Sequence, residues 1–195
     1  MAARLGGEEM KKYQIIYADP PWHYHNYADN TASRWVGNKY KVMVKKDILD
    51  LPVQSIADDN CVLFLWVTPP CLEEGLETMK AWGFKYKTKG FCWIKKNKKA
   101  DSLFWGMGYW TRSNSEDCLI GVKGRSKRID AGVHQVLHER WEAHSKKPAI
   151  ARDRIVRLMG DLPRIELFAR EKTPGWTSIG HDISGKDIRE ELRDL

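Results

Sequence analysis

The sequence lacks the features that would attach the protein to a membrane or export it. No apolar run approaches the roughly 20 residues that span a bilayer. The N-terminus, MAARLGGEEMKK, has no apolar stretch of the kind that secretory signals carry. Internal repeats, low-complexity tracts and Pro/Ser-rich linkers are also missing. These absences favour a cytoplasmic protein that does not bind membranes. The 195 residues are expected to form one domain, 1–195, with residues 1–12 loose.

Cysteine is scarce and shows no metal-binding spacing. None of the four cysteines belongs to a CxxC pair, and three of them lie inside apolar runs such as CVLFLWV and FCWI. Cysteines in such runs are typically small buried hydrophobes of a reducing compartment. The sequence therefore predicts no structural zinc site and no other bound metal.

Positive charge exceeds negative charge. The chain has 33 Lys and Arg against 26 Asp and Glu, which gives a formal net charge of +7. A basic surface favours polyanions, nucleic acid first and anionic membrane second. The same charge also fits a basic protein that is merely soluble, so charge alone leaves both interpretations open.

Apolar runs typical of buried strands recur along the chain. They occur at 13–18, 61–67, 116–123, 164–169 and 176–180. Segment 84–96 is also rich in strand-forming residues and fits either two strands or one strand bent at Gly90.

Two helices with one apolar face each separate these strands. Leu72, Leu76 and Met79 form the apolar face of a helix at about 70–82, and a second helix is expected at about 148–160. Alternating buried strands and helices indicate an α/β fold, a mostly parallel sheet with helices on both faces. In such sheets ligands bind beyond the carboxyl ends of the strands.

The segment YADPPWHY ends the first strand with an acid, two prolines and a tryptophan. Asp19 offers an acceptor for N–H donors, Pro20 supplies a carbonyl, Pro21 stiffens the loop and Trp22 offers a flat apolar face. This set suits a flat ligand with an exocyclic amino group, because a carboxylate and a carbonyl can accept its hydrogens while a ring stacks on it. The alternative is a rigid turn with a capping aspartate. The buried strand before the motif, the aromatic-rich loop after it and the basic composition favour the ligand site.

The motif resembles the signature of the MT-A70 group of adenine-N6 methyltransferases. Five further segments match the family in order, namely FLWVT, WGMGYWTRSNSEDCLIGVKG, HSKKP, RIELFAR and GWTSIG, so the resemblance covers nearly the whole chain. It implies S-adenosylmethionine as methyl donor. It also implies a Rossmann-like methyltransferase fold with permuted motif order, in which the catalytic motif comes early and the main cofactor strand late. Asp19 and Arg170, each just beyond a strand, agree with that order.

The resemblance assigns roles to individual residues. Asp19 and the Pro20 carbonyl would accept from the adenine amino group, and Trp22 would line or stack the base pocket. The catalytic residues would be Asp19, Pro20, Pro21 and Trp22. The cofactor-binding residues would be Asp19, Lys147, Glu166, Phe168, Arg170, His181 and Asp182. The chain departs from the family at Gly180-His181-Asp182, where Gly-Asn followed by Glu or Gln is common, so the contacts of His181 and Asp182 stay open.

Nucleic-acid contacts are expected from aromatic and basic residues in loops. The expected set is Tyr40, Tyr109, Lys123, Arg125, Lys127 and Arg128. Another basic cluster comprises Lys85, Lys87, Lys89, Lys95, Lys96, Lys98 and Lys99. Both clusters flank loops expected to open near the site, where they would contact phosphates; the alternative is solvated strand faces and loops. Trp105 and Trp110 would either stack flanking bases or pack the loop, with packing favoured for Trp110.

Three alternatives to DNA adenine methylation stay open. The first is a catalytically inactive methyltransferase fold that binds nucleic acid or supports an active partner. The second is methylation of cytosine N4 with a similar motif. The third is RNA as substrate; DNA is favoured over RNA because the chain has no zinc-finger module and no appended RNA-binding domain. A homodimer or a partner methyltransferase subunit fits the resemblance.

Overall fold

Seven strands form one mixed sheet at the centre of the computed structural model, which describes residues 11–23, 43–106, 108, 110–142 and 146–195. The strands are β1 (Tyr13–Ala18), β2 (Ala57–Val67), β3 (Lys85–Lys96), β4 (Ser115–Lys123), β5 (Val136–Arg140), β6 (Arg164–Leu167) and β7 (Thr177–Ile179). Their order across the sheet is β5-β3-β4-β2-β1-β6-β7. β4 is antiparallel to both of its neighbours, and every other neighbouring pair is parallel. The predicted mostly parallel sheet is confirmed.

The sheet is buried on both sides because the second part of its central strand β2, residues 61–67, is apolar at every position. Residues 61–67 of β2 are all buried. Alternate side chains of a strand point to opposite faces, and they join two separate hydrophobic clusters here. Cys61, Leu63, Leu65 and Val67 belong to the first cluster. Val62, Phe64 and Trp66 belong to the second.

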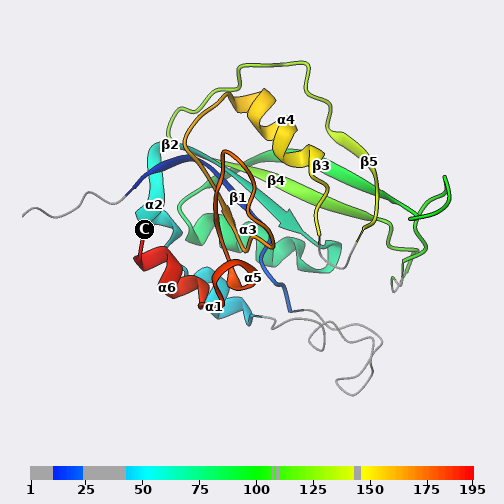
Figure 1. The fold of residues 1–195 in the computed structure, drawn as a ribbon, viewed down its shortest axis with the longest axis horizontal. Coiled ribbons are helices and arrows are strands. Elements are labelled where there is room, and N and C mark those ends of the chain that lie inside the picture. The colour runs from blue at the N-terminus through cyan, green and yellow to red at the C-terminus, as the bar shows by residue number, and fades with distance from the viewer. Residues whose placement is uncertain (1–10, 24–42, 107, 109, 143–145) are drawn as a thin grey trace, which may run out of the picture.

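Helices cover both faces, as Figure 1 shows. One face carries α1 (Lys45–Leu49), α2 (Val53–Ile56), α3 (Leu72–Ala81) and α6 (Ile188–Arg193), whose apolar side chains join the first cluster. The opposite face carries α4 (Ile150–Met159), which contributes to the second cluster. A short helix, α5 (His181–Ser184), follows β7. None of the helices in the described parts of the chain has the length and apolar character needed to span a bilayer.

The buried face of α3 differs from the predicted one. Leu72 and Leu76 are exposed, while Gly75, Thr78 and Met79 are buried. A β-carbon on Gly75 would lie 2.4 Å from Cγ1 of Val67, so the helix backbone approaches β2 closely through this glycine. The hydrophobic pattern missed this face because glycine and threonine do not count as apolar residues.

Segment 84–96 forms a single strand rather than two. β3 pairs with β4 along its length, with register shifts between Tyr86 and Thr88 and between Lys89 and Phe91. Gly90 lies within the second irregularity, and a β-carbon there would lie 2.7 Å from Cγ1 of Ile120. The bend expected at Gly90 is therefore a local irregularity of a continuous strand.

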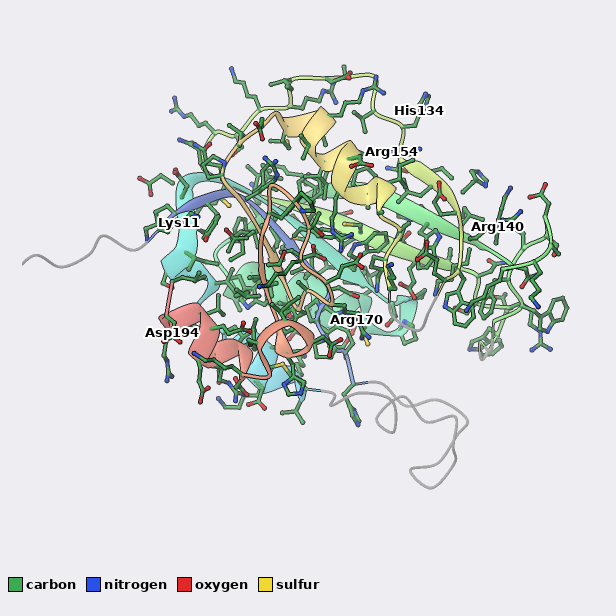
Figure 2. All side chains as sticks on the ribbon, in the orientation of Figure 1. Lys11, His134, Arg140, Arg154, Arg170 and Asp194 are labelled. Carbon is green, nitrogen blue, oxygen red and sulfur yellow. The ribbon has the colours of Figure 1, made fainter. Side chains whose placement is uncertain are left out.

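The strand directions define two different ends of the sheet. β1, β2, β3, β5, β6 and β7 all finish at one end, called here the carboxyl end, where antiparallel β4 begins. The opposite end is called the amino end. In Figure 2, Lys11, just before β1, lies at the left, and Arg140, the last residue of β5, lies at the right. The first strand, β1, pairs with the late strand β6, which is the permuted order expected from the motifs.

Candidate active site

Asp19 directly follows β1 and so lies at the carboxyl end of the sheet. The turn after it is built from the motif itself. The Trp22 backbone N–H donates to the Pro20 carbonyl (2.8 Å), and the Met43 N–H donates to the Pro21 carbonyl (3.1 Å). A carbonyl oxygen has two lone pairs, so Pro20 keeps the capacity to accept a second donor.

Trp22 anchors this turn in the core. Its indole N–H donates to the Trp66 carbonyl over 2.9 Å, and its side chain belongs to the first hydrophobic cluster. Only 5 % of the residue is exposed. A ring so deeply buried offers little surface for a stacked base, so its main contribution here is to hold the turn that carries Asp19.

Asp19 belongs to a network of four charged side chains. Lys147 Nζ donates to Asp19 Oδ2 over 2.6 Å and lies 3.2 Å from Glu116 Oε2, while Lys95 pairs with the other oxygen of Glu116. The Asp19 side chain is 21 % exposed, and the other three are more buried. Asp19, Lys147, Glu116 and Lys95 are called the four-charge network below. It combines two carboxylates with two ammonium groups, so its charges balance.

Burial and the opposite charges within the network shift the pKa values of its members. Burial raises the pKa of Asp19, and Lys147 opposes that rise without cancelling it. Burial also acts to raise the pKa of Glu116, but Lys147 and Lys95 outweigh it, and the pKa of Glu116 is lowered. Burial acts to lower the pKa of Lys147, but Asp19 and Glu116 hold that pKa above its usual range. Lys147 is therefore a permanent cation beside a carboxylate whose pKa has been raised.

Glu116 was not identified from the sequence, and Lys95 was expected to contact phosphate. The signal that would have found Glu116 is its position at the start of β4, opposite Trp93 of β3. Because β4 runs against its neighbours, its first residues reach the carboxyl end, where Asp19 lies. Lys147 was expected at the cofactor; the structure pairs it with Asp19, and its role at the cofactor stays a prediction.

A buried ion pair joins α4 to β6, the strand that pairs with β1. Arg152, in the first turn of α4, donates from Nε to Glu166 Oε2 (2.7 Å) and from a terminal nitrogen to Glu166 Oε1 (2.8 Å). Both side chains are less than one tenth exposed. Burial raises the pKa of Glu166, and Arg152 acts against that rise. Glu166 was expected at the cofactor; in the structure both of its oxygens are bonded to Arg152, and its role at the cofactor stays a prediction.

The ends of β6 and β7 bring together four of the residues expected at the cofactor. Phe168 has φ 62°, the only positive φ of a non-glycine residue in the described chain. Arg170 lies 3.8 Å from Asp182, and both are partly exposed. His181 begins α5 directly after β7. The positive charge of Arg170 also acts, more weakly than Lys147, to lower the pKa of Asp19. Figure 2 labels Arg170.

The expected nucleic-acid contacts divide into three groups. Tyr40 and Tyr109 lie outside the described residues. Lys123 and the loop after it, with Arg125, Lys127 and Arg128, lie at the amino end of the sheet. Lys123 Nζ donates to the carbonyl of Ala57 at the start of β2, and the Arg125 N–H donates to the side chain of Asn60. The expectation that this loop opens beside Asp19 is wrong, because β4 is antiparallel and ends away from the site.

The last group is basic and aromatic and lies at the carboxyl end, where β3 and β5 finish. Of the residues named from the sequence it includes Lys98, Trp105 and Trp110; Arg112 and Arg140, which the sequence analysis did not name, lie beside them. Trp110, expected to pack, is 98 % exposed instead. No cluster of three or more His, Cys, Asp or Glu side chains suited to a metal ion occurs among the described residues.

A sheet of mostly parallel strands, covered on both faces, presents an acid at the end of a central strand beside the turn after β6. This is the architecture of a Rossmann-like methyltransferase. The model of the MT-A70 family matches residues 13–182, and the chain belongs to that family.

The relatives include a bacterial protein of similar length and much longer eukaryotic proteins. Type II methyltransferase M.MunI of Mycoplasma sp is 34 % identical over an alignment of 195 positions that covers 91 % of this chain and 81 % of that protein. N(6)-adenosine-methyltransferase MT-A70-like of Arabidopsis thaliana is 31 % identical over 93 % of this chain and 25 % of its own length. The catalytic subunit METTL3 of Homo sapiens is 29 % identical over 89 % of this chain and 29 % of its own length.

Proposed function

We propose that this methyltransferase transfers the methyl group of S-adenosylmethionine to the exocyclic N6 amino group of adenine in DNA. The observation that carries the proposal is the placement of Asp19, a partly exposed carboxylate at the end of β1, beside the ends of β6 and β7. The names of the relatives support adenine N6 as the acceptor. DNA is favoured over RNA because the Type II methyltransferase M.MunI, at 34 % identity, is more similar to this chain than the two adenosine methyltransferases, at 31 % and 29 %.

Asp19 makes the acceptor nitrogen a better nucleophile. The amino group of adenine is weakly nucleophilic because its lone pair is delocalised into the ring. Hydrogen bonds from this amine to Asp19 and to the Pro20 carbonyl favour a more pyramidal nitrogen with a localised lone pair. Lys147 occupies Oδ2 of Asp19, and we assign Oδ1 to the amine. Asp19 acts here by hydrogen bonding and electrostatics, in a site where such interactions are strong.

The methyl transfer itself is a displacement. S-adenosylmethionine, held at the ends of β6 and β7, would supply the methyl group for a new bond to the nitrogen lone pair, and the electron pair of the S–CH₃ bond would stay on sulfur. In-line placement of the nitrogen and the methyl group at about 3 Å supplies much of the acceleration. The methylated nitrogen then releases one proton, which the Asp19 carboxylate is placed to accept.

The residues at the ends of β6 and β7 fit the methyl donor. When bound, S-adenosylmethionine supplies an activated methyl group on a sulfonium, and the negative charge of Asp19 complements that cation. Asp182 carries a partly exposed carboxylate that accepts from hydroxyls, and Arg170 carries a cation for a carboxylate. The positive φ of Phe168 is a backbone strain of the kind that persists at binding sites. We assign Phe168, Arg170, His181 and Asp182 to this donor.

We also propose a cytoplasmic location. All four cysteines are free thiols, which fits a reducing compartment.

The test is direct. The protein is incubated with methyl-labelled S-adenosylmethionine and either duplex DNA or RNA, and the modified nucleoside is identified after digestion. We expect N6-methyladenine in DNA. Label in N4-methylcytosine or only in RNA would overturn the assigned acceptor. Absence of both cofactor binding and label would favour the inactive scaffold.

A further inference from the structure

An exposed aromatic and cationic surface projects from the carboxyl end of the sheet, where β3 and β5 end. It comprises Lys98, Trp105, Trp110, Arg112 and Arg140, and is called the projecting surface below. Trp105 is 69 % exposed and Trp110 is 98 % exposed. The green segment that carries the two tryptophans extends beyond the sheet at the right of Figure 1. Exposed indoles of this size mark an interaction site, because their burial against a partner is favourable.

The segment before Trp105 is held in place by its own contacts. The Phe104 N–H donates to the Lys95 carbonyl (2.8 Å), and the Asn97 N–H donates to the Ser102 carbonyl (2.9 Å). The Phe104 ring stacks on Trp141 with centroids 5.5 Å apart. These bonds order the base of the projection, so Trp105 emerges from a structured hairpin.

Cations accompany the aromatic rings. The Arg112 guanidinium lies 4.9 Å from the centroid of the Trp105 ring, and Lys98 Nζ lies 4.3 Å from that of Trp141. Arg140 donates to the Lys98 carbonyl over 3.0 Å and so joins the end of β5 to the hairpin. Such cation–ring contacts hold long basic side chains in place while their charges stay near solvent.

The projecting surface lies on the same end of the sheet as the catalytic acid. Lys95, at the base of the hairpin, contacts Glu116, and Glu116 contacts Lys147, which is bonded to Asp19. A polymer bound on the projecting surface would therefore run directly to the position where Asp19 meets its acceptor.

We infer that the projecting surface binds unpaired nucleotides that flank the target base, with Trp105 and Trp110 stacking on bases and Lys98, Arg112 and Arg140 contacting phosphates. The inference rests on the proposed function, because it takes the target to be a base of a nucleic acid. Stacking on an indole requires a base with an uncovered ring face, which an unpaired base offers, and a target adenine must leave the helix to reach Asp19. Tryptophan and arginine are common in protein interfaces too, so the preference for nucleic acid over a second protein comes from the net charge of +7 and from the position of this surface at the end of the sheet that carries Asp19.

The test measures binding of a labelled single-stranded oligodeoxynucleotide by fluorescence anisotropy over a series of salt concentrations. Trp110→Ala and the double variant Trp105→Ala/Trp110→Ala should each bind more weakly, by about ten-fold per ring. Arg112→Ala should flatten the slope of log affinity against log salt by about 0.7, the value for one phosphate contact on a single strand. All three positions lie in a surface segment, and thermal melting verifies that each variant folds.

The matched control is the triple variant Arg125→Ala/Lys127→Ala/Arg128→Ala at the amino end. It removes three positive charges away from the site, so it should keep most of the affinity and the wild-type slope. If it weakens binding more than the tryptophan variants do, the strand is bound at the amino end and the inference is overturned.

Two further outcomes distinguish nucleotide binding from a protein interface and from a failure of methyl transfer. If the double tryptophan variant binds the strand as tightly as the wild type and instead changes the oligomeric state in sedimentation, the projecting surface is a protein interface and the inference fails. If the wild type binds the strand through these tryptophans but transfers no methyl group to any nucleic acid, the proposed function fails while the surface assignment stands.

Discussion

Replacing Lys147 with methionine removes the cation that lies between two partly buried carboxylates. Glu116 keeps Lys95 as a partner, but Asp19 loses the ammonium group 2.6 Å from its Oδ2. Removing one partner of a buried ion pair typically costs about 3–5 kcal/mol. The 21 % exposure of the Asp19 side chain gives it some access to water, so we expect the free energy of unfolding at pH 8 to fall by about 2–3 kcal/mol. In a chain of 195 residues this lowers Tm by about 4–12 °C.

The loss of stability in Lys147→Met should depend on pH and should grow as pH rises. Burial raises the pKa of Asp19 in the folded wild type, and removal of Lys147 raises it further. An acid whose folded pKa lies above its unfolded value of about 3.9 stabilises the fold below that value and loses this contribution as pH rises through the folded pKa. The stability deficit of Lys147→Met should therefore be small near pH 4 and should grow as pH rises.

Thermal melts at pH 4.5 and pH 8 measure this difference, and a second substitution provides the control. Asp19→Asn in the Lys147→Met background removes the unpaired charge and should recover most of the lost stability at pH 8. An equal deficit at both pH values, or no recovery with Asp19→Asn, would show that the methionine acts through packing and not through the lost cation.

Three further substitutions test other parts of the structure. Lys95→Met should move the acidic limb of the activity–pH profile to higher pH, because the four-charge network loses a cation, whereas Lys95→Arg should keep the wild-type profile. Arg152→Met should lower the free energy of unfolding by about 3–5 kcal/mol in calorimetry, because Glu166 is left buried and unpaired; a loss below about 1 kcal/mol would contradict this role. Gly75→Ala raises helix propensity, yet we expect a net loss of about 1–2 kcal/mol in denaturant unfolding, since the new β-carbon would lie 2.4 Å from Val67. A stabilised Gly75→Ala variant would show that Val67 can move.

The parts of the fold that depend on local pattern could be predicted from the sequence. The apolar runs that form β1, β2 and β6 indicate strands buried on both faces, and such strands favour a parallel sheet. That rule alone places Asp19 and Arg170 at one end of the sheet, where the structure has them. Asp19, from the early motif, and β6, the late strand, also lie side by side, as the motif order implied.

The direction of β4 could not be predicted, because hydrophobic periodicity is the same whichever way a strand runs. The antiparallel direction of β4 accounts for two differences between the predicted site and the observed one. It carries Arg125 and its neighbours to the amino end, and it brings Glu116 to the carboxyl end beside Lys147. The pairing of Glu166 with Arg152 was also missed, since Arg152 lies in a helix predicted from its apolar positions alone. The single domain over 1–195 and the roles of Tyr40 and Tyr109 stay predictions.

The most direct test of the account is the turnover of Asp19→Asn with its cofactor binding measured on the same sample. Asparagine keeps the shape of the side chain but removes the negative charge that orients the amine. We predict that the rate of labelled methyl transfer to adenine falls by at least about a hundred-fold, which is the typical loss when one electrostatic catalytic group is removed. Calorimetry should find that S-adenosylmethionine binding is weakened far less than turnover, because Asp19 supplies one charge near the sulfonium while Phe168, Arg170, His181 and Asp182 are unchanged. Turnover near the wild-type rate in a variant that still binds the cofactor would contradict the central role of Asp19.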